Sequence, residues 1–231
     1  AVLLMCSAAG VGAGCGKSSP ALLDSFGTHL DTLMTSKDKL SKMDGAAADL
    51  CVIENEDEFS ENDIEAPAGA LFNITDQKTL YSKNANDERE IASITKIMTA
   101  LLAMKYADLS QEVTISYTPE GLESSAVLCG FEQGDKMMLS SLLSAALIYS
   151  GNDAAIDIAI AVAGSQEAFV DMMNQESKEL MTSHTHFANP TGLTQSKHYS
   201  SVYDVYLMFQ ECLKYPTFRD IIARGSFLCY Y

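Results

Sequence analysis

A serine and a lysine three residues apart, Ser93 and Lys96, stand at the start of a segment with helical periodicity. Side chains at this spacing project from one face of a helix, one turn from each other. A serine hydroxyl becomes nucleophilic when a neighbour takes its proton, and a lysine can do so when burial and positive surroundings lower its pKa toward neutrality. N–H groups at the helix N-terminus would stabilise negative charge near Ser93. The pair is therefore a candidate nucleophile and general base.

This spacing alone is weak evidence, because Ser and Lys three residues apart often occur by chance and normally cap and solvate a helix. A second polar turn strengthens the hypothesis, since it separates two apolar helical segments further along the chain. It reads Ser150-Gly151-Asn152-Asp153. Turns held between packed helices are good places to present polar groups.

The elements that must position these residues follow from periodicity. Two β-like runs, 68–75 and 79–83, are separated by Asp76-Gln77-Lys78 and predict a β-hairpin. Helical periodicity over 93–107 has Ile97, Leu101 and Met104 as its buried stripe. Further helices are expected at 140–148, 154–163, 166–180 and 201–214. The turn Asn189-Pro190-Thr191-Gly192-Leu193 precedes the last of these helices.

Composition narrows the class of protein. The 231 residues, 47% hydrophobic and 20% charged, allow one domain with extensions or two small ones. The net charge of −16 repels phosphate backbones and anionic lipids at long range, which argues against nucleic acid as a partner. The six cysteines form no C-x-x-C pair, so neither a zinc knuckle nor a dense disulfide framework is indicated.

The N-terminal part of the chain is expected to precede the main domain. Residues 1–16 are uncharged and shorter than the roughly 20 apolar residues that span a bilayer, and they resemble an incomplete export signal. Small residues before Cys15 resemble a lipoprotein cleavage site, although Gly12 stands where a bulky aliphatic residue is favoured, so Cys15 is a candidate for lipidation. Residues 17–66 are expected to form a helical spacer, at 19–43, and an acidic linker.

A phosphate-binding loop is the competing interpretation of the N-terminal segment, because Gly16-Lys17-Ser18 has the ending that such loops require. Val11 replaces the first glycine, and no alternating βα pattern follows. The phosphate-binding loop is therefore disfavoured.

From about Pro67 to Asp220 the sequence closely resembles the low-molecular-mass penicillin-binding proteins, the serine D-alanyl-D-alanine carboxypeptidases related to the serine β-lactamases. The resemblance implies an α/β fold of the β-lactamase/transpeptidase type, an antiparallel sheet plus an all-helical lobe, with Ser93 at their junction. The matching segments are Leu80-Tyr81-Ser82-Lys83-Asn84-Ala85, the Ser93 and Ser150 motifs, Phe187-Ala188-Asn189-Pro190-Thr191-Gly192-Leu193, and His198-Tyr199-Ser200.

The resemblance also implies roles. Ser93 would attack the D-Ala-D-Ala bond of a peptidoglycan stem peptide and form an acyl-enzyme, with Lys96 as the base and the Ser93 N–H as one arm of an oxyanion hole. Ser150 would pass a proton to the leaving D-alanine, and Asn152 would bind the substrate amide and position Lys96. β-Lactam antibiotics would be covalent inhibitors, and no metal or other cofactor is implied. The location would be extracytoplasmic, in the bacterial cell envelope, secreted or lipid-anchored, with membrane contact only through the N-terminus.

The third motif of this family, Lys-Thr-Gly on an edge strand, is absent from the sequence, whose last residue is Tyr231. We therefore expect residues 67–231 to be an incomplete catalytic domain that lacks its C-terminal strands, in a chain truncated at both ends. The missing strand would carry an oxyanion donor, whose loss typically lowers rates roughly 100- to 1000-fold. This chain is accordingly expected to be nearly inactive and aggregation-prone.

Several alternatives stay open. A class A β-lactamase needs a Glu-x-x-x-Asn-type loop, which is not found between Ser150 and Leu193, and Glu176 and Glu179 are interpreted as solvated helix-face residues. Related transpeptidase, endopeptidase or β-lactamase activity, and a truncated or degenerate protein that binds without turnover, remain possible. His184, His186 and His198 lack a supporting carboxylate or cysteine, so no metal site is predicted.

Overall fold

The computed structural model describes residues 2–4, 50–53, 64–116, 122, 124 and 126–228. Cys15, the predicted helix at 19–43 and most of the acidic linker lie outside these residues, so the expectations for them stay predictions. The chain divides into two compact units, residues 1–85 and 86–231.

The first unit contains a three-stranded antiparallel sheet in the order β1-β2-β3. Its strands are β1 (Val2–Leu4), β2 (Gly69–Asn73) and β3 (Lys78–Lys83). The predicted hairpin is confirmed as β2 and β3. Its turn is closed by Asn73, whose Oδ1 accepts hydrogen bonds of 3.1 Å from the N–H groups of Thr75 and Asp76.

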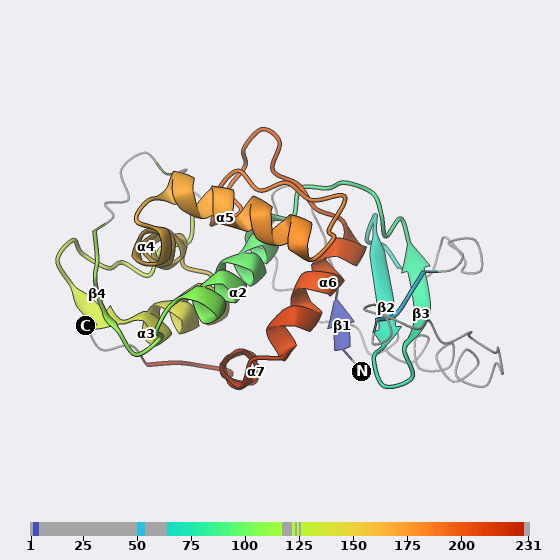
Figure 1. Cartoon of the computed structure of the whole chain (residues 1–231), viewed down its shortest axis with the longest axis horizontal. Coiled ribbons are helices and arrows are strands. Elements are labelled where there is room, and N and C mark those ends of the chain that lie inside the picture. Colours follow the sequence, from blue (N-terminus) through green and yellow to red (C-terminus); the bar gives the residue numbers. More distant parts are fainter. Residues whose placement is uncertain are drawn as a thin grey trace. The chain divides into compact units, whose positions relative to one another are not determined.

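The second unit is mainly helical (Figure 1). It contains the 3₁₀ turn η1 (Ala92–Thr95), α2 (Lys96–Tyr106), β4 (Glu112–Thr114), β5 (Lys136–Met138), α3 (Leu139–Ser144), the π-helical turn η2 (Ala145–Tyr149), α4 (Asn152–Ala163), α5 (Gln166–Glu179), α6 (Val202–Leu213) and α7 (Pro216–Ile222). The five helical segments predicted between residues 93 and 214 are confirmed. The antiparallel pair of β4 and β5 and helix α7 were not predicted, because elements this short give little periodic signal.

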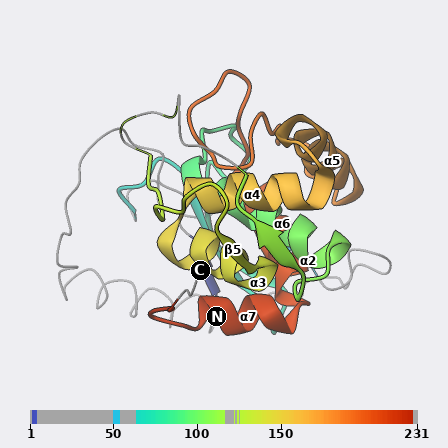
Figure 2. The same cartoon turned by 90° about the vertical axis from the view of Figure 1, so that its left-hand side faces the viewer.

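Helix α2 lies at the centre of the second unit. It contacts α4, α5 and α6, and α4 in turn packs between α3 and α5 (Figure 2). The predicted stripe is too narrow, because Ile97 and Met104 are only partly buried whereas Met98 and Leu102 are fully buried. A helix covered on several sides buries apolar residues around most of its circumference rather than along one face.

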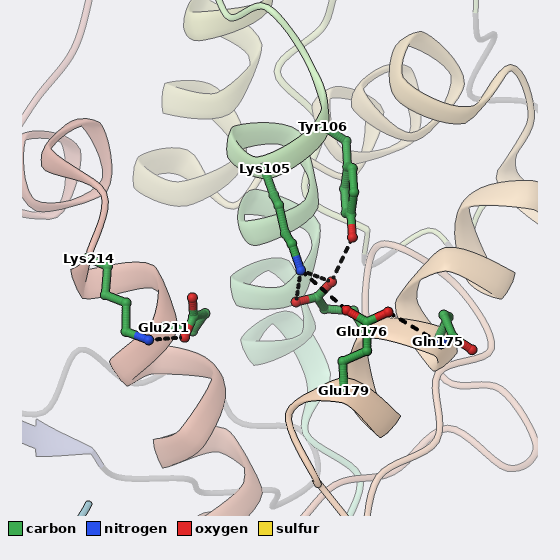
Figure 3. Close-up of polar contacts among 7 residues, drawn as sticks. All are labelled: Lys105, Tyr106, Gln175, Glu176, Glu179, Glu211 and Lys214. Atoms are coloured by element: carbon green, nitrogen blue, oxygen red, sulfur yellow. Dashed lines mark hydrogen bonds and ion pairs between the residues drawn. The ribbon is translucent and has the colours of Figure 1, made fainter. Parts of the chain in front are cut away.

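The C-terminal end of α2 is tied to α5 by a charged cluster (Figure 3). Both carboxylate oxygens of Glu176 accept hydrogen bonds from Lys105 Nζ, at 2.9 and 2.8 Å, and the Tyr106 hydroxyl donates a third at 3.2 Å. The interpretation of Glu176 as a solvated residue is wrong, since it is only 2% exposed, while Glu179 is exposed as expected. The bond to Glu176 raises the pKa of Lys105.

Caps fix the helices that follow. The Ser165 hydroxyl accepts from the Ala168 N–H at the start of α5, and the Ser201 hydroxyl accepts from the Asp204 N–H at the start of α6. Helix α4 ends at Gly164, whose φ of 83° suits a left-handed C-terminal cap. No helix within the described segments is both long and apolar enough to cross a bilayer.

Candidate active site

A 3₁₀ turn places Ser93 and Lys96, whereas the sequence predicted the first turn of an α-helix. Ser93 lies inside η1, and α2 begins at Lys96. A 3₁₀ turn has three residues per turn, so side chains three apart lie directly one above the other. Lys96 Nζ accordingly donates a 3.0 Å hydrogen bond to Ser93 Oγ. The preceding residue, Ala92, has a φ of +45°, which is uncommon for a non-glycine residue.

The Lys96 amine is enclosed by three acceptors. Besides Ser93 Oγ, it donates to Asn152 Oδ1 at 2.9 Å and to the Thr191 carbonyl oxygen at 2.8 Å. Lys96 is only 2% exposed while Ser93 is exposed, so the base is shielded from water beside an accessible hydroxyl. All three protons of the ammonium form have a partner.

Burial makes this amine a usable base. It lowers the pKa of Lys96 from 10.5 to about 8, although the nearby Cys129 and Asp153 act in the opposite direction. The expected positive surroundings are thus not the cause of the shift; desolvation of the charged form is. About a tenth of the amine is neutral at pH 7 with such a pKa, whereas an ordinary lysine would be almost entirely charged.

Ser150 also contacts the Ser93 hydroxyl. Its Oγ donates a 2.9 Å hydrogen bond to Ser93 Oγ. Ser150 follows the π-helical turn η2 and adopts a left-handed conformation with φ of 65°, and such turns and conformations cluster at functional sites. A Cβ atom at its neighbour Gly151 would lie 2.3 Å from Cys129 Sγ, so a larger residue there would require the Cys129 side chain to move.

Asn152 opens α4 and is 4% exposed. Its Nδ2 donates to the Val127 carbonyl oxygen at 3.1 Å, which turns Oδ1 toward Lys96. The adjacent Asp153 accepts from the N–H groups of Cys129 and Gly130, both at 3.0 Å, and so fixes the loop before β5 against the start of α4. The structure thus brings the predicted residues Ser93, Lys96, Ser150 and Asn152 together through hydrogen bonds.

Sequence reasoning missed the contribution of the 188–198 loop. Two successive carbonyl oxygens of this loop accept from α2: that of Pro190 from Thr99 Oγ1 at 2.7 Å, and that of Thr191 from Lys96. The turn was recognised as a place for polar groups, but a backbone carbonyl has no signature in the sequence.

His198 holds the far end of this loop. Its Nδ1 accepts from the Ala188 N–H at 3.0 Å, so its Nε2 carries the proton and donates to Thr95 Oγ1 at 2.7 Å. Burial lowers the pKa of His198 to about 4, with a smaller effect from His186, and the ring is therefore neutral near pH 7.

Among the residues that the structure describes, no group of three or more His, Cys, Asp or Glu side chains is placed to hold a metal ion. A cavity of about 470 Å³ lies between residues 88–90 and 194–199, and its lining includes neither Ser93 nor Lys96. The chemistry available to the four residues is proton transfer from Ser93 to a neutral Lys96, which makes Ser93 a nucleophile.

The family model for D-alanyl-D-alanine carboxypeptidases matches residues 55–223. The chain is 41% identical over 158 residues to D-alanyl-D-alanine carboxypeptidase DacF of Bacillus subtilis, covering 66% of this chain and 40% of that protein. It is 32% identical over 160 residues to DacA of Escherichia coli, covering 65% and 40% of the two chains. It thus spans about two fifths of the length of these curated relatives.

Solved structures of proteins with related names have a similar fold. A mutant of the Streptomyces K15 DD-transpeptidase matches with a TM-score of 0.63 and 29% identity, over 68% of this chain and 65% of that one. The D-alanyl-D-alanine carboxypeptidase of Mycobacterium tuberculosis matches with a TM-score of 0.63 and 26% identity, over 68% and 60%. The predicted α/β fold of the β-lactamase/transpeptidase type is confirmed by these neighbours.

Proposed function

The chain belongs to the D-alanyl-D-alanine carboxypeptidase family, and on this premise we propose that the protein is a serine hydrolase that removes the terminal D-alanine from peptidoglycan stem peptides. The observation that carries the proposal is the contact of 3.0 Å between Lys96 Nζ and Ser93 Oγ, made by an amine that burial keeps partly neutral. A serine is inert without such a partner.

In the acylation step, Ser93 Oγ attacks the carbonyl carbon of the D-Ala-D-Ala peptide bond while neutral Lys96 takes the hydroxyl proton. The C–N bond then breaks, and the leaving amine nitrogen receives a proton from Ser150. The proton held by Lys96 restores the Ser150 hydroxyl. The products of this step are free D-alanine and an ester of the shortened peptide on Ser93.

In the deacylation step, water attacks the ester carbonyl and gives a proton to Lys96, which returns it to Ser93 Oγ as the ester bond breaks. Asn152 contributes by holding Lys96 through Oδ1, and its amide is our candidate for binding the substrate backbone. The backbone N–H of Ser93 is proposed to stabilise the oxyanion that forms in both steps.

Partners and location follow from this reaction. The substrate is a stem peptide of the bacterial cell wall, so we propose an extracytoplasmic site of action, with lipidation of Cys15 as one means of anchoring. β-Lactams would acylate Ser93 because their strained amide resembles the scissile bond, and they are therefore useful probes.

The test uses the protein expressed from its complete reading frame. Incubation with penicillin should add the mass of the drug to the peptide containing Ser93, and incubation with a D-Ala-D-Ala peptide should release free D-alanine. Ser93→Ala should abolish both reactions, whereas Ser196→Ala, at an exposed loop position, should affect neither. Joining of the shortened peptide to an added amine would indicate a transpeptidase instead, and labelling without turnover would indicate a binding protein.

A further inference from the structure

We propose that Asn189 is a positioning residue for the general base: its side chain folds the 189–193 turn so that the Thr191 carbonyl fixes the Lys96 amine against Ser93. The kinetic test of this proposal depends on the function proposed above. Asn189 itself does not touch Ser93 or Lys96 in the structure, and it acts through the backbone of the turn.

Asn189 holds the turn with both ends of its amide. Its Oδ1 accepts from the Thr191 N–H at 3.1 Å, from Thr191 Oγ1 at 2.9 Å and from the Gly192 N–H at 2.7 Å. Its Nδ2 donates to the Leu193 carbonyl oxygen at 2.9 Å and to Gln195 Oε1 at 3.0 Å. An asparagine that binds the backbone two residues ahead closes a turn on itself. Asn189 thereby holds the peptide N–H groups on both sides of the Thr191 side chain, including the N–H of the peptide group whose carbonyl contacts Lys96.

The turn also fits closely against the nucleophile segment. A Cβ atom at Gly192 would lie 1.8 Å from the carbonyl oxygen of Ala92, the residue before Ser93. On the other side, Thr99 of α2 donates to the Pro190 carbonyl oxygen. A turn confined on both sides has little room to compensate if its internal hydrogen bonds are removed.

The chemistry of the amine explains why this carbonyl matters. Neutral Lys96 has two N–H groups and one lone pair, and the lone pair must face Ser93 if the amine is to take its proton. Asn152 Oδ1 and the Thr191 oxygen can only accept hydrogen bonds, whereas the Ser93 hydroxyl can also donate one. The two carbonyls therefore occupy the two N–H groups and leave the lone pair directed at Ser93.

Loss of the Thr191 contact has two consequences. The amine can rotate and present an N–H group to Ser93, and water can enter beside Nζ and take the place of the carbonyl. Because burial is the largest cause of the lowered pKa of Lys96, hydration should raise that pKa toward its ordinary value. Less of the amine is then neutral at pH 7.

Other groups near Lys96 must be held constant in a pH experiment. Asp153 of α4 and Cys129 of the preceding loop both act on its pKa. His198, on the same loop as Asn189, is buried and neutral over the relevant range. A Cys129→Ser background removes the thiol, one of the two groups that raise the pKa of Lys96.

The experiment measures the acylation rate with a chromogenic β-lactam between pH 6 and 10.5, in the full-length protein. If Asn189→Ala raises the pKa of Lys96 by about one unit, the rate at pH 7 falls about tenfold and recovers toward the wild-type value at the alkaline end. Asn189→Ser should give a smaller shift, because a hydroxyl closes the same kind of turn more weakly.

Asn174→Ala is the matched control. Asn174 also binds the entry of this loop, with Nδ2 donating to the Phe187 carbonyl oxygen and Oδ1 accepting from the Phe187 N–H, both at 2.9 Å, but it does not contact the 189–193 turn. Its loss should lower thermal stability and leave the pH profile unchanged. If Asn189→Ala does not fold, Asn189→Ser carries the test.

A second readout does not depend on activity. Titration of Lys96 by NMR in protein carrying ¹³C-labelled lysine, with the resonance assigned by Lys96→Met, should give a higher midpoint in the Asn189 variant. An unchanged midpoint would overturn the positioning role. Absence of acylation in the wild-type protein would refute the proposed function, while the NMR midpoint would still decide the role of Asn189.

Discussion

Lys96 Nζ lies 3.0 Å from Ser93 Oγ because a single 3₁₀ turn joins the two residues. The turn ends where α2 begins, so the hydroxyl stays exposed while the amine enters the core of the second unit. One local element thereby places an accessible hydroxyl beside a desolvated amine. Ser150, Asn152 and Thr191 reach this pair from two other parts of the chain.

The acylation rate should depend on pH through Lys96. Because the neutral amine is the proposed base and burial lowers its pKa to about 8, the rate should rise nearly tenfold per pH unit below pH 8 and level off above it. Stopped-flow acylation by a β-lactam between pH 6 and 10 would measure this. Lys96→Arg, which stays charged, should be inactive at every pH, and a flat wild-type profile would contradict Lys96 as the base.

Gly192 should tolerate no larger side chain. Its φ is 85°, and a Cβ atom would meet the Ala92 backbone at 1.8 Å, so Gly192→Ala should lower the free energy of unfolding by roughly 3 kcal/mol or more. Gly164→Ala is the matched control, because its φ of 83° is similar but its Cβ would meet nothing within 4 Å; it should cost about 1 kcal/mol. Urea unfolding measures both, and equal losses would rule out the steric explanation.

The four residues proposed to act in catalysis could be identified as candidates from sequence because each stands in a distinctive local context. Ser93 and Lys96 share one turn, and Ser150 and Asn152 fall in a polar turn between apolar helices. The long helices were equally predictable, because their hydrophobic periodicity extends over many residues. The hairpin before them was marked by its turn residues.

What sequence reasoning missed depends on partners far along the chain. Glu176 was assigned to solvent because a carboxylate in a helix is normally exposed, and only the packing of α2 against α5 supplies the lysine that allows its burial. Thr191 contributes its backbone carbonyl, which every residue has, so the residue type at this position does not predict the contact with Lys96. Neither contact can be inferred without the fold.

Lowering the pH should reduce the free energy of unfolding, partly through His198. Its pKa is about 4 in the folded chain because of burial, whereas the unfolded value is near 6.5. The unfolded state therefore binds the proton first as the pH falls, and stability that is present above pH 6.5 is lost as the pH falls toward 4, by about 3 kcal/mol in all.

His198→Gln should be less stable than the wild type at pH 7, because it disturbs the bonds to Ala188 and Thr95, but the difference should shrink as the pH falls to 4. Urea unfolding at pH 7, 5.5 and 4 tests this. The partly buried His184 provides the comparison through His184→Gln. A difference between wild type and His198→Gln that stays constant with pH would be inconsistent with a buried neutral ring.

The ion pair between Lys105 and Glu176 should contribute to stability far more than the exposed pair between Lys214 and Glu211, although both are drawn in Figure 3 as close contacts. Glu176 is 2% exposed, so Lys105→Ala leaves a buried carboxylate without its cation, while Lys214 is 70% exposed and its pair is screened by water. Because Lys105 is itself about one-third exposed, we expect a loss of about 2 kcal/mol for Lys105→Ala and less than about 0.5 kcal/mol for Lys214→Ala. Denaturant unfolding of both variants measures the difference. Similar losses in the two variants would mean that Glu176 is hydrated in solution and that α2 and α5 are held together by apolar packing alone.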